Sequence, residues 1–291
     1  MRFRGLLFLL LIQCSMLVSQ TESSPIEPEI HVYKTIGDTN LSAHIFYPAV
    51  RVTKMPVIVL IHGGGWNTGS PEWVYETGRR YAKYGAVAVA LEYRLSDSVK
   101  ITPLDSLQDA RDLVRWLLTN ENRLGIDSSR MAVYGVSAGG QLAAALAVLP
   151  DPRHPQDEIV PKAMVMVSPA LSLTSDRYFQ SLLLGKATAE ALSPDEHLDR
   201  RFPPAIIFHG VSDTLVPISG ARRFCERARQ FGNECTLIEY PGVGHLFTRK
   251  LDNQIDSFDP DPKDAADAIE KGDAFLAAQG FLPTFSAATG K

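Results

Sequence analysis

The 291-residue sequence has no excess of positive charge, few cysteines and no long polar tract. Its 29 lysine and arginine residues are outnumbered by 33 aspartate and glutamate residues, so the formal net charge is −4. This balance does not favour nucleic acid or an anionic membrane as a partner. There is also no internal repeat and no low-complexity segment, and the 45% share of hydrophobic residues is typical of a globular protein with a sizeable core.

The first apolar stretch, from Leu6 to Val18, is too short for a membrane helix, which needs about 20 apolar residues. Arg2 and Arg4 precede it and a polar segment follows it, which is the order of a secretory signal peptide. We therefore expect residues 1–20 to be a signal peptide and the protein to be secreted or periplasmic. An uncleaved membrane anchor is the alternative interpretation.

Three cysteines are present, and removal of the signal peptide also removes Cys14. An even pair, Cys225 and Cys235, then remains in an oxidising compartment, which favours a disulfide. The alternative is two free thiols, one on a helix and one at the start of a strand. Neither cysteine is a candidate for catalysis.

Short runs rich in valine, isoleucine and aromatic residues predict strands. The first two are separated by turn residues and should be antiparallel, whereas most later ones are apolar without alternation, as in a parallel sheet buried on both faces. The predicted strands are His31 to Lys34, Ala43 to Tyr47, Val57 to Ile61, Ala86 to Leu91, Met131 to Tyr134, Ala163 to Val167, Ala205 to Phe208 and Thr236 to Tyr240.

Helices are predicted between these strands, most clearly where apolar residues recur at spacings of three and four. The predicted helices are Leu104 to Leu118, Ser137 to Leu149, Ile218 to Phe231 and Pro262 to Ala278. Strands that alternate with helices over short links predict an α/β fold, with a mostly parallel eight-stranded sheet flanked by helices. We expect one domain over residues 26–285.

A Gly-x-Ser-x-Gly motif, Gly135 to Gly139, joins a buried strand to the alanine-rich start of a helix. This is the context of a nucleophile elbow, in which glycines permit a sharp turn and the serine hydroxyl projects at the edge of the sheet. The amino end of the following helix favours developing negative charge. Ser137 is therefore the candidate nucleophile.

A second glycine motif, His62 to Trp66, directly follows the predicted strand Val57 to Ile61. Its three glycines allow the backbone to approach a substrate closely and to present free amides to an oxyanion. A flexible turn or a phosphate-binding loop would be alternatives, but neither explains the position of the motif upstream of a serine elbow.

A serine hydroxyl needs a base to remove its proton and an acid to orient that base. In this architecture the order along the chain is serine, acid, histidine. Asp213 follows one predicted strand and His245 follows the next, so both should lie at the same edge of the sheet as Ser137. No metal and no cofactor is implied.

Other titratable residues are weaker candidates. His209 ends a strand and is expected to be packed beside the site, and His62 is expected to hold the glycine loop by hydrogen bonding. The remaining histidines should lie away from the site. A polar stretch contains Asp195, Glu196 and Asp199, whose charges are expected to be solvated.

These motifs resemble those of α/β-hydrolase fold esterases, specifically the hormone-sensitive-lipase-like and acetyl-xylan or feruloyl-esterase-like group. The resemblance covers most of the chain after the signal, including the Tyr93-Arg94-Leu95 and Gly244-His245-Leu246-Phe247 segments. It implies that the amides of Gly64, Gly65 and Ala138 form the oxyanion hole. It also implies an ion pair between Arg94 and Asp109.

Two features depart from the hormone-sensitive-lipase-like pattern. Val136 stands where an acidic residue is common, and strands begin within a few residues of the signal, without a long helical cap. Only the segment Thr174 to Pro203 is available as a small lid, so the site should be open. Trp66 is a candidate substrate-binding residue, and pocket size should depend on Tyr178 and Phe179.

The sequence thus predicts a serine carboxylesterase that cleaves short acyl esters, with acetyl or feruloyl groups on plant polysaccharide as a candidate substrate. A peptidase of the prolyl-oligopeptidase type is the alternative enzyme, although the chain has no room for the large extra domain such peptidases carry. A catalytically inactive binding protein on the same fold is the alternative of another class. The oligomeric state is not predicted.

Overall fold

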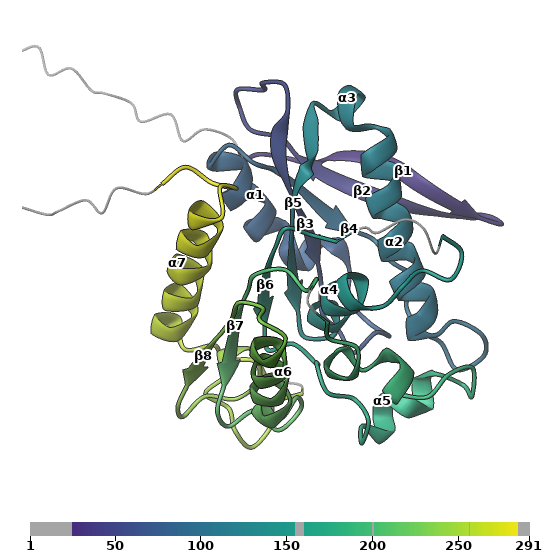
Figure 1. Ribbon diagram of the computed structural model, residues 1–291, viewed down its shortest axis with the longest axis vertical. Coiled ribbons are helices and arrows are strands. Elements are labelled where there is room, and N and C mark those ends of the chain that lie inside the picture. Colours follow the sequence, from purple (N-terminus) through teal and green to yellow (C-terminus); the bar gives the residue numbers. More distant parts are fainter. Residues whose placement is uncertain (1–24, 155–159, 200, 256, 285–291) are drawn as a thin grey trace, which may run out of the picture.

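The computed structural model describes residues 25–154, 160–199, 201–255 and 257–284 (Figure 1). The predicted signal peptide and Cys14 lie outside the described residues. Eight strands form one sheet in the order β1-β2-β4-β3-β5-β6-β7-β8. Their bounds are β1 Glu29–Ile36, β2 Thr39–Phe46, β3 Met55–Ile61, β4 Val87–Leu91, β5 Ile126–Val136, β6 Ala163–Val167, β7 Ala205–Gly210 and β8 Cys235–Tyr240.

The sheet is mostly parallel, as predicted. Strands β1, β2 and β4 pair antiparallel at one side, and every pair from β4 to β8 is parallel. Strand β5 begins earlier than predicted, at Ile126. Residues 126 and 127 pair with the start of β3, and a shift in register follows before the next pair, Val57 with Met131. Hydrogen bonding to a neighbour extends a strand here beyond its apolar segment.

Helices cover both faces of the sheet (Figure 1). One face packs against α1 Tyr75–Lys83 and α7 Pro262–Ala278, and the other against α2 Pro103–Thr119, α4 Ala138–Val148 and α6 Ile218–Gln230. Alternate residues of a strand point to opposite faces, so Val57 and Val59 join one core and Ile58 and Leu60 the other. Short elements complete the described fold: η1 Pro71–Val74, α3 Glu121–Leu124, α5 Arg177–Leu182, η2 Glu190–Leu192, η3 Pro194–Glu196 and η4 His245–Phe247.

Helix α1 was not predicted from the sequence. It is short and contains Gly78, a residue that weakens helices. A Cβ atom at Gly78 would lie 2.6 Å from the ring of Phe46, so the glycine lets the helix pack closely on β2. Tertiary packing therefore outweighs helix propensity at this position.

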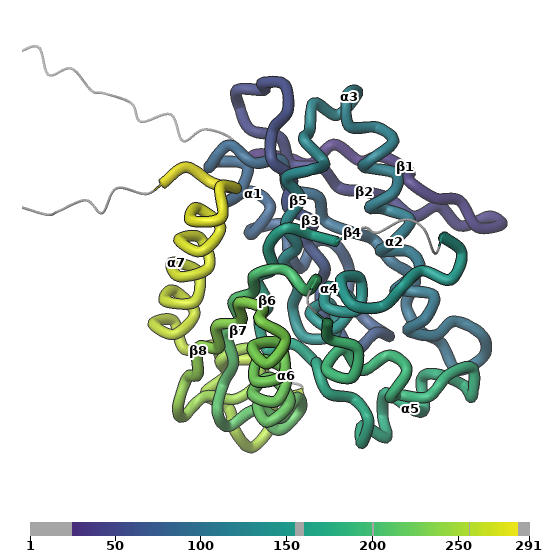
Figure 2. The backbone as a smooth tube through the Cα atoms, in the orientation of Figure 1, coloured from purple at the N-terminus to yellow at the C-terminus, as the bar shows by residue number. Residues whose placement is uncertain are grey.

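Between β6 and β7 the chain leaves the sheet and passes through α5, η2 and η3 before it returns (Figure 2). This excursion contains the segment expected to form a lid. Asp195 lies within it and was expected to be solvated, but that expectation is wrong. Its side chain is fully buried and accepts hydrogen bonds from Arg223 of α6 and from Ser193, at 2.6 Å each.

The Arg94–Asp109 ion pair implied by the resemblance is present. Both Asp109 oxygens accept hydrogen bonds from the Arg94 guanidinium, at 2.9 Å each. Lys34 of β1 also contacts the Asp109 carboxylate. This buried carboxylate therefore joins the edge strand, helix α2 and the segment that follows β4.

Candidate active site

Ser137 stands between the end of β5 and the first residue of α4, with φ 53° and ψ −117°. A positive φ is uncommon for a residue with a side chain and stores backbone strain. The Ser137 amide donates to the Val167 carbonyl of β6 at 2.9 Å, and the Ser137 carbonyl accepts from Gly140 at 2.9 Å. The predicted strand, turn and helix are confirmed, but the helix begins at Ala138 instead of Ser137.

The glycines of this turn are required by close packing. A Cβ atom on Gly135 would lie 2.6 Å from the Gly139 carbonyl oxygen, and one on Gly139 would lie 2.2 Å from the Ile61 carbonyl oxygen. No side chain fits at such distances. The turn is consequently pressed against the end of β3, where the His62 to Trp66 loop begins.

Three side chains from three strand ends form a continuous hydrogen-bonded chain. Ser137 Oγ lies 3.0 Å from His245 Nε2, and His245 Nδ1 lies 2.7 Å from Asp213 Oδ2. The other carboxylate oxygen, Oδ1, accepts the backbone N–H groups of Leu215 and Val216 at 3.0 and 2.8 Å. The structure thus brings together the serine, histidine and aspartate predicted from sequence, in the geometry of a catalytic triad.

The environment of Asp213 keeps its carboxylate ionised. Burial by itself would raise the pKa of Asp213, but hydrogen bonds from His209 and His245 outweigh it and lower the pKa to about 2. An ionised carboxylate can only accept hydrogen bonds, so the His245 nitrogen that faces it, Nδ1, carries the hydrogen. The lone pair of Nε2 then faces the Ser137 hydroxyl, as proton removal requires.

The glycine loop lies directly against the serine. A Cβ atom on Gly63 would be 3.2 Å from the Ser137 Cβ. The loop turns tightly because the Gly64 carbonyl accepts the amides of Asn67 and Thr68, at 3.2 and 3.0 Å. Within the described part of the chain, the amides of Gly64, Gly65 and Ala138 have no hydrogen-bond partner. They are therefore available to an oxyanion.

His62 holds this loop, as predicted. Its Nδ1 lies 2.7 Å from the Gly63 carbonyl oxygen, and its ring stacks on Tyr93 with centroids 4.3 Å apart. The Tyr93 hydroxyl donates to the His62 carbonyl at 3.0 Å. Burial lowers the pKa of His62 to about 4, so the ring is neutral at physiological pH.

Trp66 and the excursion after β6 are packed together. The Trp66 indole is buried, donates to Gln141 of α4 at 2.9 Å, and lies 4.6 Å from the Phe179 ring of α5. The Tyr178 hydroxyl donates to the Gly65 carbonyl at 3.1 Å. Helix α5 thereby contacts the glycine loop directly. Because the Trp66 indole N–H is used within the protein, the role of this residue in substrate binding stays a prediction.

Gln254 is a site residue that sequence reasoning missed. Its side-chain oxygen accepts the amides of His245 and Thr214, at 2.9 and 3.2 Å, and its nitrogen donates to the Ser212 carbonyl at 2.9 Å. This buried amide ties the Asp213 loop to the His245 loop. In the sequence it is a lone glutamine in a polar segment, and no motif distinguishes it.

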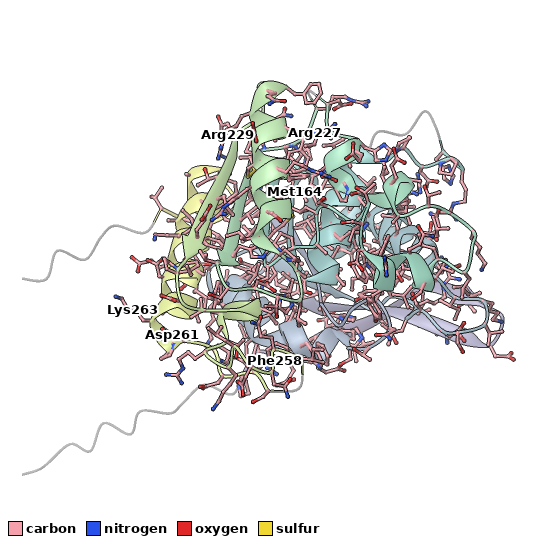
Figure 3. All side chains as sticks on the ribbon, turned by 90° about the horizontal axis from the view of Figure 1, so that it is seen from below. Met164, Arg227, Arg229, Phe258, Asp261 and Lys263 are labelled. Carbon is pink, nitrogen blue, oxygen red and sulfur yellow. A yellow bond between two sulfur atoms is a disulfide. The ribbon has the colours of Figure 1, made fainter. Side chains whose placement is uncertain are left out.

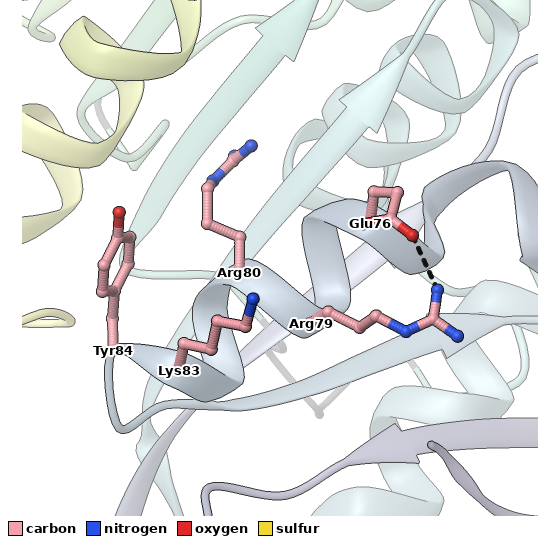
Figure 4. A pocket seen from close by; sticks show the side chains of 5 residues that line it. All are labelled: Glu76, Arg79, Arg80, Lys83 and Tyr84. Atoms are coloured by element: carbon pink, nitrogen blue, oxygen red, sulfur yellow. Dashed lines mark hydrogen bonds and ion pairs between the residues drawn. The ribbon is translucent and has the colours of Figure 1, made fainter. Parts of the chain in front are cut away.

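A pocket of about 350 Å³ lies on α1, away from these residues (Figure 4). Its lining is largely charged and consists of Glu76, Arg79, Arg80, Lys83 and Tyr84. Arg79 pairs with Glu27 and Glu76, and Arg80 pairs with Asp273, so most of the positive charge is neutralised.

The described residues contain no cluster of histidine, cysteine and carboxylate side chains placed to hold a metal ion. None of their helices is long and apolar enough to span a bilayer.

The sequence profile of the α/β-hydrolase fold family matches residues 58–249. That range includes all three members of the triad, and the chain belongs to this family.

Among solved structures, Thermogutta terrifontis esterase 2 phosphoramylated by tabun is similar over 91% of this chain and 100% of that one, at 30% identity and a TM-score of 0.79. The propionate-bound form of the same esterase aligns at 29% identity and a TM-score of 0.77, over 91% and 98% of the two chains. Esterase LipC of Mycobacterium tuberculosis is 27% identical over 66% of this chain and 53% of LipC. The chain spans about half the length of LipC and of the isoprenylcysteine methylesterase of Arabidopsis thaliana, and 14% of a polyketide synthase of Preussia isomera.

Proposed function

We propose that this protein is a serine carboxylesterase. The observation that carries the proposal is the hydrogen-bonded chain of Ser137, His245 and Asp213. Beside it lie three amides of the glycine loop and of α4 that have no partner among the described residues. The similar structures and LipC are named as esterases, which supports the same reaction class.

In the proposed mechanism, Ser137 Oγ attacks the ester carbonyl carbon while His245 Nε2 accepts the hydroxyl proton. The amides of Gly64, Gly65 and Ala138 donate to the oxyanion that forms. His245 then returns the proton to the departing alcohol, and a water molecule hydrolyses the acyl-serine by the same sequence of transfers. Asp213 stays ionised throughout and stabilises the imidazolium, in keeping with its lowered pKa.

Replacement of the nucleophile tests this reaction class. Ser137→Ala should lower kcat for p-nitrophenyl acetate by on the order of 10⁴-fold or more, because the covalent step is lost. Ser129→Ala, at an exposed position earlier in the same strand, is the matched control and should keep wild-type activity. Wild-type turnover by Ser137→Ala would overturn the proposal.

The two alternatives make different predictions. A peptidase of the prolyl-oligopeptidase type would cleave dipeptide anilides in preference to esters, whereas we expect ester cleavage only. An inactive binding protein would not react with a fluorophosphonate, whereas we expect stoichiometric labelling that is absent from Ser137→Ala.

For the substrate, we propose a short acyl group on a bulky alcohol such as a plant polysaccharide. A propionate-bound structure of the similar Thermogutta esterase supports a short acyl group. Exposed aromatic rings beside the triad and the glycine loop support a large alcohol. The Phe258 ring lies 6.4 Å from that of His245, the Trp73 ring lies 6.2 Å from that of His62, and Tyr178 contacts Gly65. Their exposed fractions are 48%, 63% and 48% in that order, and Phe258 is labelled in Figure 3.

A panel of acetyl, butyryl, feruloyl and longer acyl esters, together with acetylated xylan, tests this finer proposal. We expect kcat/KM to fall with acyl length and acetylated xylan to be deacetylated. A preference for long acyl chains would contradict the carbohydrate assignment and leave the reaction class standing.

We also propose that the protein acts outside the cytoplasm. The amino-terminal sequence pattern supports this, and so does the disulfide between Cys225 and Cys235. Detection of the protein in the periplasm or medium, with the leader removed, would test it. A protein retained in the cytoplasm with its leader intact would contradict it.

A further inference from the structure

A second histidine contacts the triad carboxylate. His209 lies near the end of β7 and is fully buried. Its Nε2 is 2.8 Å from the Val216 carbonyl oxygen and 3.2 Å from Asp213 Oδ2. Both neighbours are acceptors, so Nε2 carries the hydrogen. The other ring nitrogen, Nδ1, has no partner among the described residues, which makes the neutral ring with hydrogen on Nε2 the form that fits the site.

His209 closes a small ring of contacts around Asp213. Val216 donates its amide to Asp213 Oδ1, and its carbonyl accepts from His209. His209 therefore holds both the carboxylate and the turn that carries it. Asp213 Oδ2 is shared between two histidine donors, with His245 the nearer at 2.7 Å.

We propose that His209 is a positioning residue for the esterase reaction: it fixes Asp213 and, by sharing Oδ2, weakens the hold of that carboxylate on the protonated form of His245. The proposal rests on the proposed function. A hydrogen bond to one carboxylate oxygen withdraws charge that the oxygen would otherwise offer to its other partner. In consequence the pH dependence of the reaction should change when His209 is replaced.

The charged groups around His209 are few. Asp213 faces it from the loop after its own strand, and His245 lies on the far side of that carboxylate. On β8, Glu239 stands opposite His209 in the register of the sheet, and its carboxylate accepts a hydrogen bond from Arg222 at 2.9 Å. Because Glu239 is neutralised by Arg222, Asp213 is the charge that His209 chiefly acts on.

Two substitutions separate the hydrogen bond from the volume of the ring. His209→Phe keeps a ring and loses the donor, whereas His209→Gln keeps an N–H donor at similar reach. We expect His209→Phe to lower kcat for p-nitrophenyl acetate about tenfold with little change in KM. In the pH profile of kcat/KM, the acid limb of this variant should move to higher pH by about 0.5 to 1 unit. His209→Gln should restore most of both quantities, and His44→Phe, which removes a buried histidine from β2, should match wild type.

An acid limb in His209→Phe that is unshifted or shifted downward would overturn the proposal. So would a failure of His209→Gln to rescue kcat despite a wild-type melting curve. If wild type itself does not hydrolyse esters, the proposed function fails instead, which is a distinct outcome.

A measurement on wild type remains decisive if His209→Phe does not fold. In a protein labelled with ¹⁵N-histidine, NMR at neutral pH should show His209 with hydrogen on Nε2 and a bare Nδ1. The resonance is assigned by its loss in His209→Gln. Hydrogen on Nδ1 would contradict the proposed contact with Asp213.

Discussion

At the residue scale, two residues of the site are in energetically unfavourable states that their neighbours stabilise. Ser137 has a positive φ, and the amides around it hold the turn in place. Asp213 is a buried charge that four hydrogen-bond donors stabilise. Both states exist only in the folded protein.

His62 gives a testable pH dependence. Burial lowers its pKa to about 4, while an unfolded chain has an ordinary histidine pKa of about 6.5. Between these values the unfolded chain binds a proton that the folded protein does not, so stability should decrease as the pH falls through that window. The shift corresponds to a loss on the order of 3 kcal/mol.

The control is His62→Phe, which keeps a ring against Tyr93 but cannot titrate. Urea unfolding at pH 7 and at about pH 4.5 should show a smaller loss of stability for this variant than for wild type. Asp213 does not disturb the comparison, because its pKa is lowered from below pH 4 to about 2 and its contribution is lost only under more acidic conditions. Equal losses in the two proteins would refute the assignment.

At the scale of elements, the site is assembled by the ends of parallel strands and the loops that follow them. Loops after β3, β5, β7 and β8 supply the glycine loop, Ser137, Asp213 and His245. The sheet fixes the direction in which each strand ends, and Gln254 ties the last two loops together. Helix α5 adds a contact to the glycine loop from outside the sheet.

The disulfide between Cys225 of α6 and Cys235 of β8 is confirmed, with a separation of 10 residues. Closing a loop of this length should stabilise the fold by about 2 to 3 kcal/mol through the entropy of the unfolded chain. We expect the Cys225→Ser and Cys235→Ser double variant to lose about that much in urea unfolding and to keep wild-type kcat/KM. Reduction with dithiothreitol should reproduce the loss in wild type and leave the variant unchanged. Unaltered stability in both tests would contradict a structural role.

At the scale of the whole molecule, most of the sheet follows from sequence pattern. Apolar runs flanked by turn residues predict the strands, and their alternation with helices predicts a mostly parallel sheet. Helix α1 and the polar start of β5 could not be found this way. The first depends on the fit of Gly78 against Phe46, and the second on pairing with β3.

Motif order along the chain and strand-end position select Ser137, Asp213 and His245 among all similar residues, so the candidate triad could be predicted from the sequence. What surrounds these residues depends on the tertiary structure. Asp195 is buried against Arg223, the Gln254 amide bridges two loops, and a second histidine contacts Asp213. These contacts involve residues that are far apart in the chain or that lie in segments without a recognisable motif. Local patterns carry no information about such contacts, since distance in space and exclusion of water arise only when the chain has folded.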